Sequence, residues 1–424
     1  MSDTEPTGHS TSQGELVPKG WRHAKLGDIA RITSGGTPDR ATPEYWGGEV
    51  PWVTTGEIQF NTITSTTEKI TEAGLQNSSA KRFPPGTLLM AMYGQGKTRG
   101  QVAKLGIEAA TNQACAAILL QDGHESDFYF QYLSSQYEAI RELGNAGTQQ
   151  NLNGAILKLL PVPVPPITEQ RHITKILATW DLAIATTEQL IEKSRKQKQS
   201  LMQLLLSGRR RFTGADGTWK YVDFDSVFDR VNRKNAAGNV NVLTISGERG
   251  LISQRDYFNK SVASASLTGY TLLNRGDFAY NKSYSVGYPM GAIKPLLEYD
   301  SGVVSSLYLC FRLRDDAMAC LDFFRHYFEA GIFNQEIEGI AQEGARNHGL
   351  LNVSVTDFFK LRLHIPSGSE QRQIAEVINV AEGEEFHYKW QLKTLLIEKQ
   401  ALMQQLLTGK RRVRLQRTEA EVQA

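Results

Sequence analysis

The sequence predicts an α+β protein built from two similar mixed α/β domains, each followed by a long helix, with the two helices paired as a coiled coil. Two observations carry this prediction. The 424-residue chain repeats itself in frame, because Thr168-Glu169-Gln170-Arg171 returns 201 residues later as Ser369-Glu370-Gln371-Arg372. After each copy, apolar residues recur every three or four positions for roughly 40 residues, which is the spacing of a helix seam.

The repeat also covers the end of each helical stretch. Ser207-Gly208-Arg209-Arg210-Arg211 returns as Thr408-Gly409-Lys410-Arg411-Arg412, again 201 residues later. The two copies therefore align without a gap. A repeat of this length in a chain of this size predicts two similar halves.

The composition is that of a soluble globular protein, with 40% apolar and 22% charged residues. The formal net charge of +2 neither favours nor excludes nucleic acid, because such binding depends on where charge clusters. Cys115, Cys310 and Cys320 are scattered without metal-ligand spacing, and we expect reduced thiols in a cytoplasmic protein. No stretch of 18 apolar residues predicts a membrane span, and the polar N-terminus lacks an apolar signal core.

The first half begins with a polar segment, 1–15, expected to be disordered, and its domain is expected at 16–166. Short apolar runs separated by Gly and Pro predict strands, and one helix is expected over 126–143. A polar loop at 147–153 has the short amides and hydroxyls that suit turns and ligand contacts. The strands are expected at 50–53, 87–93 and 114–120.

The first long helix is expected at 167–212, with Thr168 as its N-cap and Gly208 as its terminator. About 40 residues at about 1.5 Å each make a rod of about 60 Å. No domain of this size needs so long a helix for its own core, so the helix must pack on an equally long partner. The second half supplies it, with a domain at 213–367, a helix at 368–412 and a polar tail at 413–424.

Polar residues interrupt both helix seams. Such residues cost stability and fix register or partner choice, so they are candidates for binding another subunit, although they also fit ordinary imperfections of a two-helix coil. They are Thr187, Ser194 and Lys198 in the first helix, and Glu385 and Lys399 in the second.

The segment Ala91-Met92-Tyr93-Gly94-Gln95-Gly96-Lys97-Thr98 fits a loosened phosphate-loop pattern, which leaves an NTPase as an alternative function. That mechanism needs a helix after the loop, whereas residues 99–103 read more as a strand. A basic hairpin loop that contacts DNA fits this segment and its counterpart at 281–287 better. No convincing catalytic triad, carboxylate pair or metal cluster is present in the sequence.

The duplicated Thr/Ser-Glu-Gln-Arg and Gly-Arg/Lys-Arg motifs, together with the opening Gly35-Gly36-Thr37-Pro38, Tyr45-Trp46-Gly47-Gly48 and Pro51-Trp52-Val53, resemble the specificity (S) subunits of type I restriction–modification systems. The resemblance covers about residues 16–412. It implies two target recognition domains held apart by an antiparallel coiled coil, each domain reading one half of a split, asymmetric DNA target.

The resemblance also implies that this chain has no catalysis and no cofactor of its own. Double-stranded DNA and two modification subunits are the expected partners. The modification subunits would use S-adenosylmethionine to methylate adenine, and restriction or motor subunits that use ATP and Mg²⁺ could join. A coiled-coil scaffold without DNA readout stays open as a second alternative.

The position of each loop in the repeat points to the residues expected to contact DNA. Basic side chains would hold phosphates, and loop amides would read base edges. The candidates are Lys97, Thr98, Arg99, Gln149 and Gln150 in the first domain, and Lys282, Tyr284, Arg346, Asn347 and His348 in the second.

Overall fold

The structure is a computed structural model, and it describes residues 18–413 except 95, 145–150, 216, 248, 259–265, 316–317 and 344–350. The segment 1–15, expected to be disordered, and most of the expected C-terminal tail lie outside these residues. The chain folds into two compact units. Unit 1 is made of residues up to 186 and from 391 onward, and unit 2 of residues 187–390.

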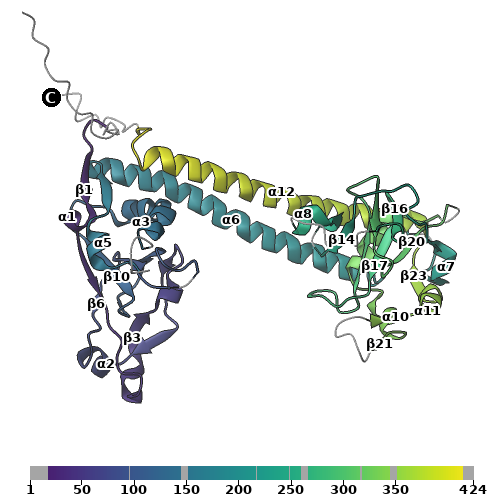
Figure 1. Cartoon of the computed structure of the whole chain (residues 1–424), viewed down its shortest axis with the longest axis horizontal. Coiled ribbons are helices and arrows are strands. Elements are labelled where there is room, and N and C mark those ends of the chain that lie inside the picture. Colours follow the sequence, from purple (N-terminus) through teal and green to yellow (C-terminus); the bar gives the residue numbers. More distant parts are fainter. Residues whose placement is uncertain are drawn as a thin grey trace, which may run out of the picture. The chain divides into compact units, whose positions relative to one another are not determined.

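Unit 1 is a mixed α/β domain with three sheets (Figure 1). The strand orders are β1-β11, β2-β10-β7-β8-β4 and β5-β3-β9-β6. Its strands are β1 (Arg22–Lys25), β2 (Ala30–Ser34), β3 (Trp46–Val53), β4 (Thr62–Ile63), β5 (Glu68–Ile70), β6 (Arg82–Phe83), β7 (Leu88–Ala91), β8 (Val102–Leu105), β9 (Ala109–Thr111), β10 (Cys115–Leu120) and β11 (Pro161–Val164). Its helices are α1 (Leu26–Ile29), α2 (Glu72–Gln76), α3 (Ser126–Ser135), α4 (Tyr137–Leu143) and α5 (Gly154–Lys158), with 3₁₀ turns η1 (Pro43–Tyr45) and η2 (Thr55–Glu57).

The single helix expected over 126–143 is wrong, because the structure has two helices that meet at Gln136. The hydroxyl of Ser134 donates to the backbone oxygen of Phe130 at 2.7 Å, and that of Ser135 donates to the oxygen of Tyr132 at 2.6 Å. Such bonds compete with the helix's own N–H groups and favour a bend. The break makes α4 a separate element.

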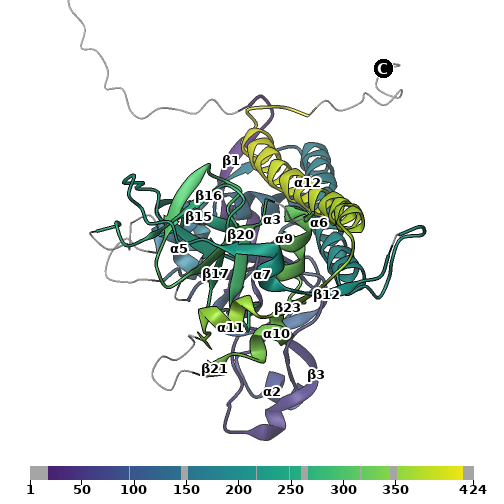
Figure 2. The same cartoon turned by 90° about the vertical axis from the view of Figure 1, so that its right-hand side faces the viewer.

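Unit 2 repeats the frame of unit 1, with β12-β23 in place of β1-β11 and β13-β20-β17-β18 in place of β2-β10-β7-β8. Figure 2 looks toward unit 2, with β17 and β20 of the larger sheet labelled. Its strands are β12 (Lys220–Asp223), β13 (Phe228–Arg230), β14 (Leu243–Ser246), β15 (Gly250–Ser253), β16 (Thr271–Asn274), β17 (Phe278–Asn281), β18 (Ala292–Pro295), β19 (Ser301–Val304), β20 (Leu309–Leu313), β21 (Gln342–Glu343), β22 (Leu351–Asn352) and β23 (Arg362–Ile365). Its short helices are α7 (Phe224–Val227), α8 (Gln254–Phe258), α9 (Leu321–Glu329), α10 (Asn334–Glu338) and α11 (Val355–Phe359).

The two long helices are α6 (Ile167–Leu205) and α12 (Gly368–Leu406), each of 39 residues. They run antiparallel, and each unit contains one end of each helix. In unit 1 Lys399 of α12 pairs with Asp181 of α6 at 2.5 Å, and in unit 2 Lys198 of α6 pairs with Glu385 of α12 at 2.6 Å. Neither long helix, nor any other helix among the described residues, is long and apolar enough to cross a membrane. The predicted fold class, two similar mixed domains with an antiparallel helix pair, is confirmed.

A buried ionic clasp ties the start of each long helix to the end of the other. In unit 1 Glu169 accepts hydrogen bonds from Arg412 Nε at 2.6 Å and from the Trp21 indole at 2.6 Å. In unit 2 Glu370 accepts the same bonds from Arg211 Nε at 3.0 Å and from the Trp219 indole at 3.5 Å. Both carboxylates are almost completely buried. The clasp therefore explains why Glu and Arg occur at the same places in both copies of the repeat.

The glutamine after each clasp carboxylate joins the helix to its domain. Gln170 donates to the oxygen of Pro165 at 2.8 Å and accepts from the backbone of Glu125, the N-cap of α3, at 2.8 Å. Gln371 makes the matching pair of bonds with Pro366 at 3.1 Å and with Cys320, the N-cap of α9, at 3.0 Å. The repeated Glu-Gln pair thus fixes where each domain meets its helix.

Candidate nucleic-acid interface

The hairpin between β7 and β8 presents the first group of candidate DNA-contacting residues. Lys97 is exposed at its tip, and Thr98 and Arg99 are half-buried. Gly94 has a φ of +142° and Gly96 a φ of +72°, a backbone range that favours glycine. A Cβ on Gly94 would also lie 2.9 Å from the Cβ of Thr98. The glycines therefore set the shape of the loop that carries Lys97.

Helix α4 clamps the backbone of this loop. The hydroxyl of Tyr137 donates to the carbonyl of Lys97 at 2.5 Å, and the guanidinium of Arg141 donates to the carbonyl of Gly96. Arg141 also donates to the Tyr137 hydroxyl at 3.2 Å. Both backbone carbonyls of the loop are therefore held by α4, and the Lys97 side chain is exposed to solvent. A positioned cation on a fixed loop can meet phosphate at a lower entropic cost than a mobile one.

Phe60 packs against Tyr137, one of the two residues that hold the loop. Its ring meets the edge of Tyr137 at a centroid distance of 5.2 Å and an angle of 89°. Among the residues that the structure describes, Phe60 is the only non-glycine with a positive φ, at 55°. Such strain persists only where the surrounding structure holds it, and it often marks functional sites. This observation sets the Phe60–Tyr137 contact apart from ordinary surface packing.

The hairpin between β17 and β18 presents the second group. Tyr284 is 61% exposed, Val286 is 92% exposed, and Lys282 is half-buried. The hairpin is tied back by Tyr288, whose hydroxyl bonds to the carbonyl of Gly247 at 2.9 Å and to Glu329 of α9 at 2.8 Å. The same strand pair thus carries an exposed tip in both units, but different residues fill and anchor it.

Each hairpin is hydrogen-bonded to a residue that follows the second segment predicted to contact DNA in its unit. Leu152 donates its backbone N–H to the carbonyl of Met92 at 3.1 Å, and Leu351 donates to the carbonyl of Lys282 at 2.9 Å. The chain therefore returns beside the hairpin immediately after 145–150 in unit 1 and after 344–350 in unit 2. Gln149, Gln150, Arg346, Asn347 and His348 themselves lie outside the described residues, so their role as DNA contacts stays a prediction.

The phosphate-loop alternative for Lys97 is wrong. A turn at residues 96–100 leads into strand β8, so no helix N-terminus follows Gly96-Lys97-Thr98. A phosphate loop depends on that helix, whose free N–H groups would bind the phosphate. The strand follows because Val102, Ala103 and Leu105 fill core positions of the sheet.

The polar seam residues lie inside the helix pair. Thr187, Ser194 and Glu385 are 3%, 5% and 5% exposed, and Lys198 and Lys399 form the ion pairs described above. These contacts show how the seam is filled within this chain. Binding of another subunit by these five residues stays a prediction.

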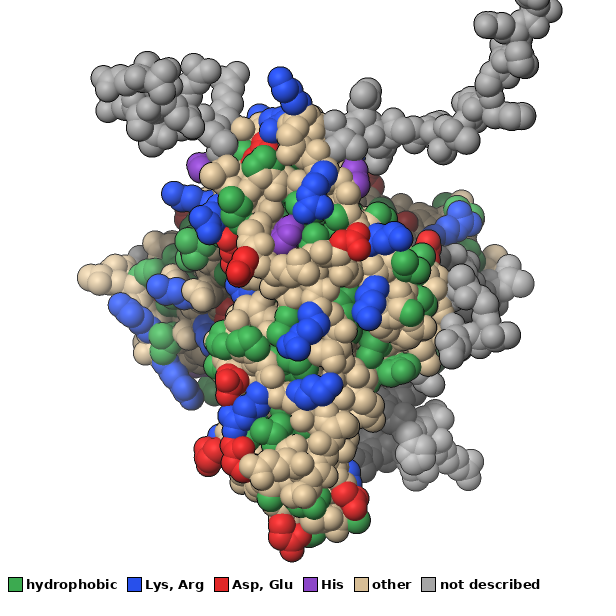
Figure 3. Space-filling view, turned by 90° about the vertical axis from the view of Figure 1, so that its left-hand side faces the viewer, with side chains coloured by type: hydrophobic (Ala, Val, Ile, Leu, Met, Phe, Trp, Pro, Cys, Tyr) green, Lys and Arg blue, Asp and Glu red, His purple; other side chains and the backbone are tan. Residues whose placement is uncertain are grey.

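Sequence reasoning missed the residues that position the site. Tyr137 and Arg141 lay within a helix expected to continue through residue 143, and nothing local links them to a loop 40 residues earlier. The Glu-Gln pairs were visible as a repeat, but their partners were not. Surface charge does not mark the site either, because Figure 3 shows Lys and Arg side chains spread over this face of unit 1 with acidic side chains among them.

Comparison with known proteins gives consistent matches. Residues 18–193 match the family model "Type I restriction modification DNA specificity domain". The chain is 29% identical over 195 residues to the type I restriction enzyme MjaIX specificity subunit of Methanocaldococcus jannaschii, covering 45% of this chain and 43% of the relative. It is 27% identical over 208 residues to the EcoR124I/EcoR124II specificity subunit of Escherichia coli, covering 47% and 50%. The match thus spans about half the length of these curated relatives.

Solved structures extend the likeness in fold to nearly the whole chain. The S subunit of a type I restriction–modification system from M. genitalium superposes with a TM-score of 0.52 at 15% identity, covering 94% of this chain and 98% of that one. A structure described as showing complex assembly and conformational transition of the type I system superposes with a TM-score of 0.58 at 16% identity, covering 94% and 100%. At these identities the likeness establishes the fold.

Proposed function

We propose that this chain is the DNA-reading, non-catalytic specificity subunit of a type I restriction–modification system, because residues 18–193 match that family's DNA specificity domain and specificity subunits are among its relatives in sequence and in fold. It would recognise a bipartite, asymmetric DNA target and direct adenine methylation by partner subunits. Unit 1 would read one half of the target and unit 2 the other.

One observation carries the proposal of two readers. The same strand order and the same return of the chain beside the hairpin occur in both units, while the hairpin tips differ. Lys97 and Thr98 occupy one tip, and Tyr284 and Val286 the other. Contacts to phosphate set the position of a protein on DNA, whereas side chains at base edges read the sequence. A shared frame with different exposed tips therefore suits two units that bind DNA in the same way but recognise different sequences.

The long helices would set the spacing between the two half-sites, with the 39 residues of each helix acting as the ruler. The partners would be two modification subunits that bind S-adenosylmethionine, and restriction or motor subunits that use ATP and Mg²⁺ could join. In this assignment the present chain supplies specificity and holds no cofactor. The scaffold alternative would require that neither hairpin affects DNA sequence preference.

The proposal is tested by long-read detection of methylated adenines in a host that carries this chain and its modification subunits. Wild type should give one split motif. Lys97→Ala should relax or abolish recognition of one half of that motif, and Arg346→Ala should do the same to the other half. Equal loss at both halves from either single substitution would contradict the two-reader assignment, and an unchanged motif in both variants would favour the scaffold.

A further inference from the structure

A cleft in unit 2 carries a charge imbalance that the fold does not need. It has a volume of about 870 Å³ and lies between the C-terminal part of α6, the middle of α12, helix α9 and the β17–β18 hairpin. Among the described residues that line it, six are cationic and four are acidic. The cations are Arg195, Lys198, Arg249, Lys294, Arg325 and Lys389, and the acids are Glu298, Glu329, Glu382 and Glu385.

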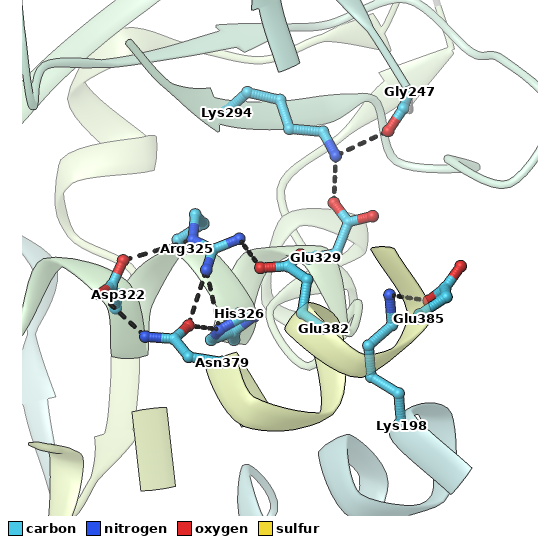
Figure 4. A network of polar contacts seen from close by, with 10 residues as sticks. All are labelled: Lys198, Gly247, Lys294, Asp322, Arg325, His326, Glu329, Asn379, Glu382 and Glu385. Carbon is cyan, nitrogen blue, oxygen red and sulfur yellow. Dashed lines mark hydrogen bonds and ion pairs between the residues drawn. The ribbon is translucent and has the colours of Figure 1, made fainter. Parts of the chain in front are cut away.

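Two ion pairs account for two of the cations inside the cleft (Figure 4). Lys294 pairs with Glu329 and donates to the carbonyl of Gly247 at 3.0 Å. Arg325 pairs with Glu382 at 2.8 Å and also binds Asn379. These contacts join α9 to β18 and to α12, so they belong to the structure of the cleft wall.

The surplus lies at Glu385, where one carboxylate holds three cations. Lys198 lies 2.6 Å away, Lys389 2.8 Å and Arg195 3.7 Å. Burial raises the pKa of Glu385, but its hydrogen bonds and attraction to Lys198 and Lys389 more than offset this and hold the pKa at about 2. The carboxylate is therefore ionised at neutral pH, and three cations around one anion leave a surplus of two positive charges.

Two of these cations are placed to reach a ligand. The side chain of Lys198 is 21% exposed and lies in the seam, whereas those of Arg195 and Lys389 are 48% and 51% exposed. Both also line the cleft. Arg195 also lies 3.8 Å from Glu192, but Lys196 pairs with the same carboxylate at 3.3 Å. Glu192 and Lys196 cancel each other, so the surplus of two positive charges remains. The buried carboxylate thus gathers two half-exposed cations at the mouth of a hollow, which is an arrangement suited to an anion with several acceptor oxygens.

The other copy of the repeat shows that the helix pair can form without this cluster. The positions 201 residues away from Glu385, Arg195 and Lys389 hold Ile184, Leu396 and Glu188. Lys399, the counterpart of Lys198, pairs with Asp181 alone among the described contacts. Because the repeated frame closes without the three-cation cluster in unit 1, coil formation does not account for the cluster in unit 2.

We propose that this cleft binds the phosphate backbone of the DNA duplex, with Arg195 and Lys389 as its phosphate contacts. The proposal rests on the proposed function, because it takes DNA as the ligand. Val286 and Tyr288 of the β17–β18 hairpin form part of the cleft lining, so a strand whose bases meet the exposed Tyr284 tip lies next to these cations. The contact is independent of sequence, and it would add affinity without changing the half-site that unit 2 reads.

The test measures the salt dependence of binding to a labelled random-sequence duplex, using the full chain in complex with its modification subunits. Arg195→Gln/Lys389→Gln should make the slope of log K against log salt shallower by about 0.9 for each contact removed, or about 1.8 in total. The methylated motif should stay the same. Lys193→Gln/Lys393→Gln is the matched control, because it also removes one exposed cation from each long helix and neither lysine lines the cleft.

Three results would overturn the proposal. An unchanged slope in the cleft variant would show that Arg195 and Lys389 do not contact phosphate. An equal change of slope in the control variant would show that the effect comes from the general charge of the helices and not from the cleft. An unchanged slope together with easier loss of the modification subunits in sedimentation would assign the cleft to an acidic protein surface. If the cleft variant shows the predicted slope change but the wild-type complex has no half-site preference, the proposed function is contradicted and the phosphate site stands.

Discussion

Removing Arg412 should loosen the junction between the start of α6 and the end of α12. Arg412→Ala takes away both guanidinium bonds to Glu169, at 2.6 and 3.0 Å, and leaves a carboxylate that is only 3% exposed with the Trp21 indole as its remaining described side-chain donor. Breaking a buried ion pair by removing one partner costs about 3–5 kcal/mol. The Arg412 side chain is 42% exposed, so water compensates in part and we expect about 2 kcal/mol.

The assay is hydrogen exchange followed by mass spectrometry, because a protein with two units has no single unfolding free energy. A loss of about 2 kcal/mol should speed exchange about 30-fold in peptides from the start of α6 and the end of α12, since each 1.4 kcal/mol is a factor of ten. Glu169→Gln should cost about 1 kcal/mol, because the neutral amide still accepts a hydrogen bond and Arg412 can turn to water. The equivalent clasp at Glu370 in unit 2 is the internal control.

Two results would refute this reasoning. If Glu169→Gln were more damaging than Arg412→Ala, the penalty would not come from an uncompensated buried charge. If peptides around Glu370 exchanged as much faster as those around Glu169, the effect would be global and not local to one clasp. The double variant should cost less than the two single losses added together, because the two residues share one interaction.

Three further outcomes are expected. Arg141→Ala and Tyr137→Phe should weaken binding to one half-site by about 10-fold or more, since each removes a hydrogen bond that holds the Lys97 loop; competition binding with single half-site changes measures this, and equal weakening at both halves would contradict it. Residues inserted within 185–200 should change the tolerated gap in the methylated motif and leave both halves unchanged, whereas an unaltered gap would remove the ruler. Burial and the charge of Arg325 lower the pKa of His326 below its usual 6.5, so the unfolded chain takes up a proton that the folded one refuses. Unit 2 should therefore lose stability as pH falls below about 6.5, and His326→Gln should flatten this dependence in thermal melts of the full chain.

Sequence periodicity identified the architecture because its signals are local and occur twice. The seam spacing needs only neighbours three and four residues apart, and two copies in register leave little choice but two similar halves with paired helices. The same argument failed for the helix expected over 126–143, where the Ser134 and Ser135 hydroxyls bend the backbone at Gln136. Side-chain competition for backbone groups is not visible in an apolar pattern.

For a related reason, the sequence predicts where the candidate interface lies but not the contacts that hold it. The repeat, the two long helices and the hairpin that carries Lys97 could all be predicted from the sequence. It could not show that Arg412 reaches Glu169 across 243 residues, that Tyr137 and Arg141 hold the Lys97 loop, or that Arg195 and Lys389 gather at one buried carboxylate. These contacts depend on the folded structure, because each joins side chains that the packing of separate elements brings together.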